Sequence, residues 1–174
     1  GDNSSGGSND SSAEGELVTN GGFETGDFSG WEVYDGGTKA VVNTDQNGGT
    51  YSASLSSTNG GGDAVIKAAN LASGSLTTGQ TATISFDLKG SMTGAGGVVF
   101  AQLFHEKAAG GTSNGEGMLS GAPLALSSSW QSHSYTSVIS GEVAGGVSLL
   151  LKAGCGGDAC TVDAYFDNVS VTVK

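Results

Sequence analysis

The sequence contains no arginine, one proline, two cysteines and two histidines in 174 residues, and only 13% of its residues are charged. Its 6 lysines stand against 17 acidic residues, so the net charge is −11. Surfaces that bind nucleic acid present clustered arginine and lysine, so this balance argues strongly against such a partner. The acidic residues indicate either a self-repelling extracellular surface or carboxylates for a divalent cation.

Long apolar runs are also missing, and no stretch approaches the ~20 residues that a membrane span requires. No signal peptide is visible, and we expect the chain that begins at Gly1 to be a mature product. Runs of helix-forming residues are absent too. Instead, 32 glycines separate short runs of Val, Ile, Leu, Thr, Ser and Phe. These residue types fit pleated strands, so the sequence predicts one all-β domain.

Strands are predicted at ten places, separated by Gly, Asn and Ser turns: 16–19, 31–35, 39–45, 51–57, 63–71, 81–90, 97–107, 123–139, 145–152 and 160–173. Polar and apolar residues alternate in several of them. In residues 83–89, Ile84, Phe86 and Leu88 share one face. This pattern predicts a jelly-roll β-sandwich of two antiparallel sheets. The Gly-rich segment 110–122 is expected to be a long loop.

Residues 1–15 contain no large apolar side chain, so the segment cannot offset the entropy of ordering it. We expect a flexible linker or tether there, and a folded domain over 16–174. A spacer of this kind also follows the lipidated cysteine of bacterial lipoproteins, although the sequence does not contain that cysteine.

The two cysteines, Cys155 and Cys160, flank four residues. A metal site would need further ligands nearby, and a redox pair would normally enclose two residues rather than four. We therefore favour a disulfide across a short loop, which stabilises the fold by about 2 kcal/mol on the chain-entropy model. A disulfide predicts a secreted or cell-surface protein in an oxidising compartment.

Two motifs mark the ends of the predicted domain. Near its start, residues 20–24 read Asn-Gly-Gly-Phe-Glu and a Gly-Trp pair follows at 30–31; near its end, residues 165–171 read Tyr-Phe-Asp-Asn-Val-Ser-Val. In these motifs the sequence resembles carbohydrate-binding modules of families four and nine, which are related to families sixteen and twenty-two. The resemblance covers residues 16–174 and implies a non-catalytic module that binds a polysaccharide.

The resemblance also implies a structural calcium ion. Its ligands would be the side chains of Glu24 and Asp167, the carbonyls of Gly22 and Thr50, and the side chain of Asn47, where relatives often have an acid; Asp45 is a possible substitute. Hard oxygen ligands of this kind suit calcium. The alternative is that Glu24 and Asp167 are satisfied by backbone amides without a metal.

In the relatives, sugar lies across a concave sheet. Strand alternation predicts that Lys67, Asp87, Lys89, Gln102, Phe104 and Lys152 face this cleft, with Phe100 on the same side as Phe104. Three lysines on one sheet indicate a cleft for an anionic polysaccharide such as alginate, whereas the alternative is ordinary surface lysines. An aromatic residue of the relatives' cleft is missing near Asp63, which weakens any transfer of glucan or xylan specificity. Trp31 and Trp130 are expected in the core rather than as sugar platforms.

Catalysis finds little support in the sequence. Residues 111–115 match Gly-x-Ser-x-Gly, but they lie in a predicted loop rather than between a strand and a helix. His105 and His133 form no metal-binding motif. Asp87 and Glu106 are carboxylates of the type that cleave glycosidic bonds, but nothing singles them out as a pair. We therefore expect a non-enzyme.

Two functions remain. The first is a module that targets an attached catalytic domain or surface anchor to a polysaccharide, which is either anionic, such as alginate, or a β-glucan. The alternative is a structural or adhesive sandwich of an extracellular assembly or filament, in which the low-complexity N-terminal segment pairs with the open sheet edge of a neighbouring molecule.

Overall fold

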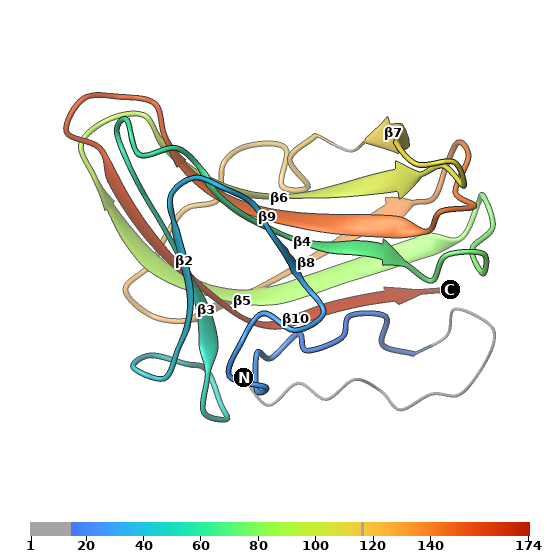
Figure 1. Cartoon of the computed structure of the whole chain (residues 1–174), viewed down its shortest axis with the longest axis horizontal. Helices are drawn as coiled ribbons and strands as arrows, with labels where there is room; N and C mark the ends of the chain where they lie inside the picture. The colour runs from blue at the N-terminus through green and yellow to red at the C-terminus, as the bar shows by residue number, and fades with distance from the viewer. Residues whose placement is uncertain (1–14, 116) are drawn as a thin grey trace.

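The computed structural model describes residues 15–115 and 117–174, and within them all regular secondary structure is β-strand (Figure 1). The predicted tether, residues 1–15, lies outside the described residues except for Gly15. The strands are β1 (Glu32–Val33), β2 (Thr38–Val42), β3 (Ser52–Thr58), β4 (Ala64–Leu71), β5 (Thr81–Thr93), β6 (Gly97–Glu106), β7 (Thr112–Gly115), β8 (Gln131–Val138), β9 (Val147–Cys155) and β10 (Thr161–Val173).

The strands form two five-stranded sheets that pack face to face. Sheet A has the order β1-β4-β9-β6-β7, and sheet B has the order β2-β3-β10-β5-β8. Every pair of neighbouring strands is antiparallel. In Figure 1, sheet A lies above sheet B. The predicted jelly-roll sandwich is confirmed.

Three segments differ from the prediction. Residues 16–19 form no strand, although the Leu17 amide donates to the Val171 carbonyl (2.9 Å) beside β10. Residues 123–130 are also irregular, because only β8 lies within the predicted strand 123–139. The predicted loop 110–122 contains β7, which its glycine and serine content concealed.

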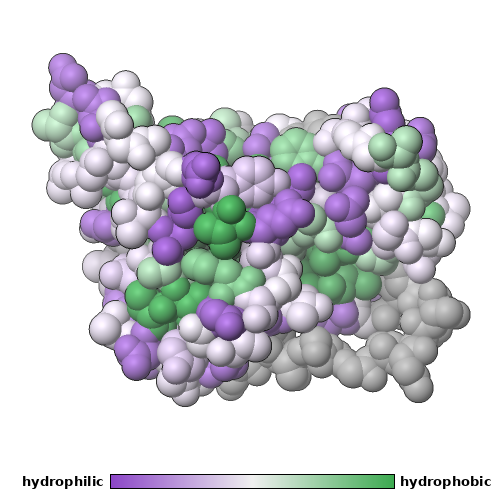
Figure 2. Space-filling view, viewed as in Figure 1, coloured by the Kyte–Doolittle hydropathy of each residue, from purple (hydrophilic) through white to green (hydrophobic). Residues whose placement is uncertain are grey.

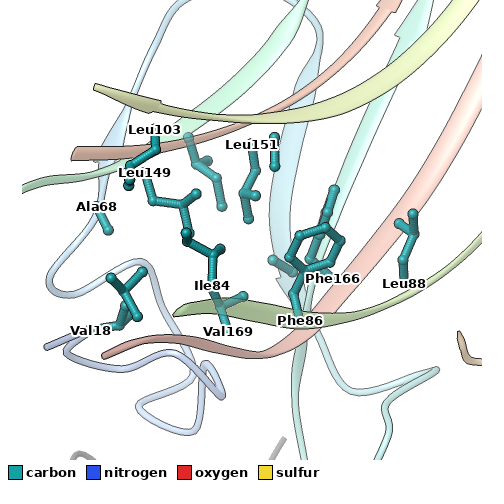
Figure 3. Packing of buried hydrophobic residues seen from close by; sticks show 14 of the residues in the cluster. Val18, Ala68, Ile84, Phe86, Leu88, Leu103, Leu149, Leu151, Phe166 and Val169 are labelled. Atoms are coloured by element: carbon teal, nitrogen blue, oxygen red, sulfur yellow. The ribbon is translucent and has the colours of Figure 1, made fainter. Parts of the chain in front are cut away.

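Alternating apolar residues from both sheets fill the space between them. Figure 3 shows Phe86 and Phe166 of sheet B pointing toward Leu103, Leu149 and Leu151 of sheet A. All five side chains are buried. Burying each of them stabilises the fold by roughly 1.5–3 kcal/mol, so this shared layer holds the two sheets in a fixed relation.

Three hairpin tips gather at one end of the sandwich, at the upper left of Figure 1: those between β3 and β4, between β5 and β6, and between β9 and β10. The Asn59 amide donates to the Cys160 carbonyl (3.2 Å), and the Gly156 amide donates to the Gly96 carbonyl (2.9 Å). Cys155 and Cys160 form the predicted disulfide, with their Cα atoms 5.7 Å apart. The disulfide closes the tip between β9 and β10, and the two main-chain hydrogen bonds join this tip to the other two.

The two ends of the described domain meet beside β10. Gly15 lines the same cavity as Thr172, Val173 and Lys174. The opening segment continues along the last strand, where the Val169 amide donates to the Gly21 carbonyl at 2.9 Å. Among the described residues, no helix is long and apolar enough to cross a bilayer.

Candidate functional site

Four of the six residues predicted to face the cleft, Lys67, Gln102, Phe104 and Lys152, lie on the outer face of sheet A. Strand pairing places Phe100 beside Lys152, and Gln102 beside Leu150, which is itself the partner of Lys67. The intervening residues of these strands point inward into the core. We call this surface the Lys67–Lys152 face and define it by six side chains: Tyr34, Lys67, Phe100, Gln102, Phe104 and Lys152.

Lys89 does not belong to this face, so the prediction of three lysines on one sheet is wrong. Lys89 and Asp87 lie on β5 of sheet B, on the opposite side of the sandwich. The Lys89 ammonium lies 2.7 Å from the Asp45 carboxylate. Alternation indicates which residues of one strand share a face, but not which of two sheets the strand joins.

Each lysine of the face lies near a carboxylate. Lys152 Nζ lies 2.7 Å from Asp63 Oδ2, and Lys67 Nζ lies 3.7 Å from Glu106 Oε2. Glu106 is only 6% exposed and also accepts hydrogen bonds from Thr112 (2.8 Å) and Ser148 (3.1 Å). These carboxylates offset the lysine charges, so the face is not strongly positive.

Aromatic rings lie beside the same lysines. The Lys152 ammonium lies 5.2 Å from the centre of the Phe100 ring, and the Lys67 ammonium lies 5.9 Å from that of Phe104. Tyr34 follows β1 at the edge of the sheet and is 41% exposed. The face therefore combines apolar ring surface with groups that donate and accept hydrogen bonds.

The hydroxyl of Tyr34 donates to Glu32 Oε1 at 2.9 Å. Burial raises the pKa of the Tyr34 phenol and the bond to Glu32 adds to this rise, while Lys67 opposes it. The phenol therefore stays protonated at neutral pH and remains a donor.

Sequence reasoning missed Glu32, Tyr34, Asp63 and Glu106 as members or partners of this face. Glu32 and Tyr34 are two residues apart in a predicted strand, so the sequence indicated that they share a side. Their position beside Lys67 depends on the pairing of β1 with β4, which is a contact between distant segments.

The upper outline of the molecule, above sheet A, dips between the hairpin tips and the β7 end (Figure 2). Hydrophobic residues on the surface shown there form small patches among polar ones. The Lys67–Lys152 face itself offers aromatic rings for stacking and polar groups for hydrogen bonds.

Neither tryptophan contributes to the face. Trp31 is 8% exposed, packs 5.3 Å from the Phe23 ring and donates from Nε1 to the Asn20 carbonyl. Trp130 is half-buried and donates from Nε1 to Asp45 Oδ1 at 3.1 Å. Trp31 lies in the core as expected, but the same expectation for Trp130 is wrong, because Trp130 is only half-buried and anchors the loop that carries Asp45.

The predicted calcium ligands gather around the loop 45–51. Glu24 accepts hydrogen bonds from the amides of Thr50 (2.8 Å) and Tyr51 (2.9 Å). Asp167 is fully buried and accepts from the Asn47 amide at 2.8 Å. Gly22 is buried in the turn that precedes Glu24. The structure thus brings the opening and closing motifs to one loop.

Charge and burial at this loop are compatible with a cation. Burial raises the pKa of Asp167, although the amides of Asn47 and Asn168 oppose this rise. Burial would also raise the pKa of Glu24, but hydrogen bonds that include those from Thr50 and Tyr51 lower it overall. Ionised Asp167 is therefore costly, and a cation would stabilise it.

Oxygen atoms with unused capacity lie close by. Asn47 and Asn168 both donate from Nδ2 to Asp87 Oδ2, at 2.9 and 2.8 Å. The buried oxygens Asn168 Oδ1 and Gln46 Oε1 have no hydrogen-bond partner among the described residues. Carboxylate and amide oxygens are the donors that calcium prefers, so the residues present fit the ion. The described residues contain no group of three or more His, Cys, Asp or Glu arranged for a metal, so the remaining ligands would be carbonyl oxygens.

The Gly-x-Ser-x-Gly match at 111–115 lies within the edge strand β7 and its approach, not in a strand-to-helix turn. Ser113 Oγ donates to the main-chain carbonyls of His105 and Glu142. Its hydroxyl thus fastens β7 to strand β6 and to the loop that carries Glu142.

The fold is a β-sandwich of two antiparallel sheets, and one of its outer faces carries both polar and aromatic side chains. Comparison with protein families matches residues 15–145 to the CBM_4_9 family, described as a carbohydrate binding domain. The chain belongs to this family, which supports a role in carbohydrate binding. A comparison with curated proteins finds no significant match.

Solved structures share the fold. A xylan-binding CBM22-1 domain of Paenibacillus barcinonensis Xyn10C is 16% identical, with a TM-score of 0.64, and the match covers 93% of this chain and 96% of that one. A family 16 carbohydrate-binding module gives 19% identity and a TM-score of 0.62 over 90% and 99%. The enzymatically active domain of bacteriophage CBA120 tailspike protein 4 is 14% identical, with a TM-score of 0.69. That match covers 91% of this chain but only 21% of the tailspike chain.

Proposed function

We propose that this chain is a non-catalytic module that uses the Lys67–Lys152 face to hold an attached catalytic domain or cell surface against a polysaccharide. The observation that carries the proposal is the gathering of two phenylalanines, a tyrosine, a glutamine and two lysines on one outer face. Membership of a carbohydrate-binding family supports it.

The charges of the face favour a neutral polysaccharide over an anionic one. Lys67 and Lys152 are each close to a carboxylate, and Glu32 adds a third acidic group beside Lys67. A uronate polymer such as alginate would have to displace these carboxylates or lie against them. Sugar hydroxyls would instead donate to the carboxylates and accept from the ammonium groups. A neutral β-linked polymer such as a β-glucan or a xylan fits this arrangement, and one of the similar folds is a xylan-binding domain.

Each side chain has a distinct role in this proposal. Phe100 and Phe104 offer apolar surface to the C–H faces of sugar rings. Gln102, between them on β6, presents an amide that both donates and accepts hydrogen bonds. Tyr34 donates from the edge of the sheet. Together they orient a sugar chain without reacting with it.

The biological effect would be proximity. Weak contacts with a repetitive polymer raise the local concentration of whatever the module is joined to, and a flexible linker lets the joined domain explore the polymer. A secreted or cell-surface location fits the Cys155–Cys160 disulfide.

The test compares two aromatic truncations on opposite faces. Phe104→Ala removes apolar surface from the Lys67–Lys152 face, and Tyr165→Ala removes a half-buried ring of β10 in sheet B. We expect affinity electrophoresis on β-glucan, xylan and alginate to show retardation by a neutral polymer. Phe104→Ala should lower the affinity for that polymer about tenfold, and Tyr165→Ala should leave the affinity unchanged. Retardation by none of the polymers, or equal losses in both variants, would contradict the proposal.

We further propose that Glu24 and Asp167 hold a structural calcium ion, with the carbonyls of Gly22 and Thr50 and the side chain of Asn47 as further ligands. The support is their convergence on one loop, the burial of Asp167 and the oxygens of Gln46 and Asn168 nearby. The ion would supply positive charge that compensates these carboxylates and would tie the opening segment to β10.

A further inference from the structure

The edges of the two sheets differ in how well they are protected against pairing with another chain. β1 has 2 residues, β7 has 4, and β2 has 5 including Lys39. Short strands and charged side chains are features by which proteins prevent edge-to-edge association. The fourth edge, β8 in sheet B, has 8 residues.

β8 has none of these protective features. It reads Gln-Ser-His-Ser-Tyr-Thr-Ser-Val, so it contains no charge and no proline. It pairs with β5 in unbroken register from Gln131 to Val138, without a bulge. On its other side, no main-chain hydrogen bond joins residues 131–136 to any other described part of the chain. A long, regular and neutral edge of this kind is a template for one more strand.

We propose that β8 pairs antiparallel with β8 of a second copy of this chain, joining the two B sheets into one continuous sheet. An antiparallel pair of identical strands is related by a two-fold axis perpendicular to the sheet, so the contact closes on itself as a dimer. The occupant is a second copy because the strand is uncharged within a chain of net charge −11. Two copies therefore meet least repulsion along this edge.

The strand is also complementary to itself. Residues opposite each other in an antiparallel pair share a face, so the register that pairs Ser134 with its own copy places His133 opposite Tyr135. These two rings already stack along β8, with centroids 6.3 Å apart. Burial lowers the pKa of His133, although Asp87 opposes the shift, so the imidazole is uncharged at neutral pH. On the outer side the same register pairs Ser132 with Thr136, and pairs of hydroxyl residues also suit a sheet.

This geometry has a consequence for polysaccharide binding, and this step rests on the proposed function. A two-fold axis perpendicular to the joined sheet keeps both A sheets on the same side of it. The two Lys67–Lys152 faces then point in the same direction, as required for binding one polymer surface at two places. Linked sites of this kind raise apparent affinity by roughly 10²–10⁴-fold without any new contact.

The test introduces the same charge at the edge and one strand further in. Ser134→Lys places a lysine at the centre of β8, where the two-fold axis would bring it against its copy. Thr83→Lys places one on the same outer face of β5, an interior strand. We expect sedimentation equilibrium without sugar, from micromolar to millimolar protein, to show a monomer–dimer equilibrium. Ser134→Lys should raise the dissociation constant of the dimer at least tenfold, and Thr83→Lys should leave this constant unchanged.

Two further measurements make each outcome decisive. Thermal unfolding checks that both variants fold, and Thr136→Lys replaces Ser134→Lys if that variant does not. A wild-type monomer at every concentration, or a dimer that both edge variants leave intact, would overturn the proposal. Retention on insoluble polymer should fall on the order of tenfold in Ser134→Lys while binding of a short soluble oligosaccharide stays unchanged. A dimer that is sensitive to Ser134→Lys and binds no polymer would support the β8 contact and contradict the proposed function.

Discussion

Lys89 and Lys152 stand in similar sequence surroundings, each at the polar position of an alternating strand, yet the sandwich places them on opposite sides. Lys152 lies beside Phe100 on the outer face of sheet A. Lys89 is paired with Asp45 on sheet B and holds the loop that Trp130 also contacts. In the proposed function Lys152 contacts the ligand, whereas Lys89 fixes a loop through Asp45.

This difference gives a prediction for matched substitutions. Lys152→Met should weaken polysaccharide binding, because it removes a donor and leaves the Asp63 carboxylate unpaired. Lys89→Met should leave binding unchanged and should lower the free energy of unfolding by at most about 1 kcal/mol, since the Lys89–Asp45 pair is partly exposed. Isothermal titration with the preferred polysaccharide and chemical denaturation measure the two effects. Weaker binding in Lys89→Met would show that the ligand reaches sheet B.

At the scale of elements, the hairpin tips are held together by close contact of their main chains. Gly94 has a φ of +72°, and a Cβ atom there would lie 2.3 Å from the Ala159 carbonyl oxygen. Gly60, in the neighbouring tip, has a φ of +83° but no atom within 4 Å of such a Cβ. The first glycine allows two hairpins to approach, whereas the second only allows its own turn.

Alanine at these two positions should therefore have unequal effects. Gly60→Ala imposes only the cost of a left-handed conformation, about 1 kcal/mol. Gly94→Ala adds a clash between two main chains and should cost more than about 2 kcal/mol. Chemical denaturation of both variants measures the difference. Equal losses of unfolding free energy in the two variants would mean that the tip between β5 and β6 can move away from the tip between β9 and β10.

The sequence predicted most strands, because alternation such as that of Ile84, Phe86 and Leu88 is a local signal. It failed where local signals mislead. The apolar residues of 123–130 suggested a strand, but the segment forms none. Its Leu124 is buried against the core and its amide donates one hydrogen bond to the Val99 carbonyl at 2.8 Å. The strand β7 lies in a segment of glycine and serine. Neither the sheet that β5 joins nor the neighbour of β1 is encoded within one strand, so the sequence placed Lys89 on the wrong sheet and missed Tyr34 on the Lys67–Lys152 face.

At the scale of the whole molecule, an acidic chain brings two distant carboxylates to one loop. The raised pKa of Asp167 means that the folded state binds its proton more readily than the unfolded state does. Stability from this group is therefore present at low pH and is lost as the pH rises through the folded pKa. At neutral pH, the proposed calcium ion would compensate this loss.

We expect calcium to raise the melting temperature of the wild-type protein at pH 7, and a chelator to lower it. Glu24→Gln should reduce this dependence, because it removes one of the two charged ligands. Glu142→Gln, a change of equal charge in a distant loop, should keep it. The stabilisation by calcium should shrink as the pH falls, since protons then compete for Asp167. Differential scanning calorimetry with calcium or with a chelator measures each effect. A wild-type melting temperature that changes with neither addition would rule out the ion.

The meeting of Gly15 with Thr172–Lys174 has a consequence for modular architecture. Because the polypeptide enters and leaves the sandwich at one place beside β10, the whole domain can be spliced into a surface loop of a host protein without separating the ends of that loop. The host would then lie against the junction beside β10, which belongs to sheet B, while the outer face of sheet A stays open. The same unit can thus serve at either terminus or in the interior of a larger polypeptide.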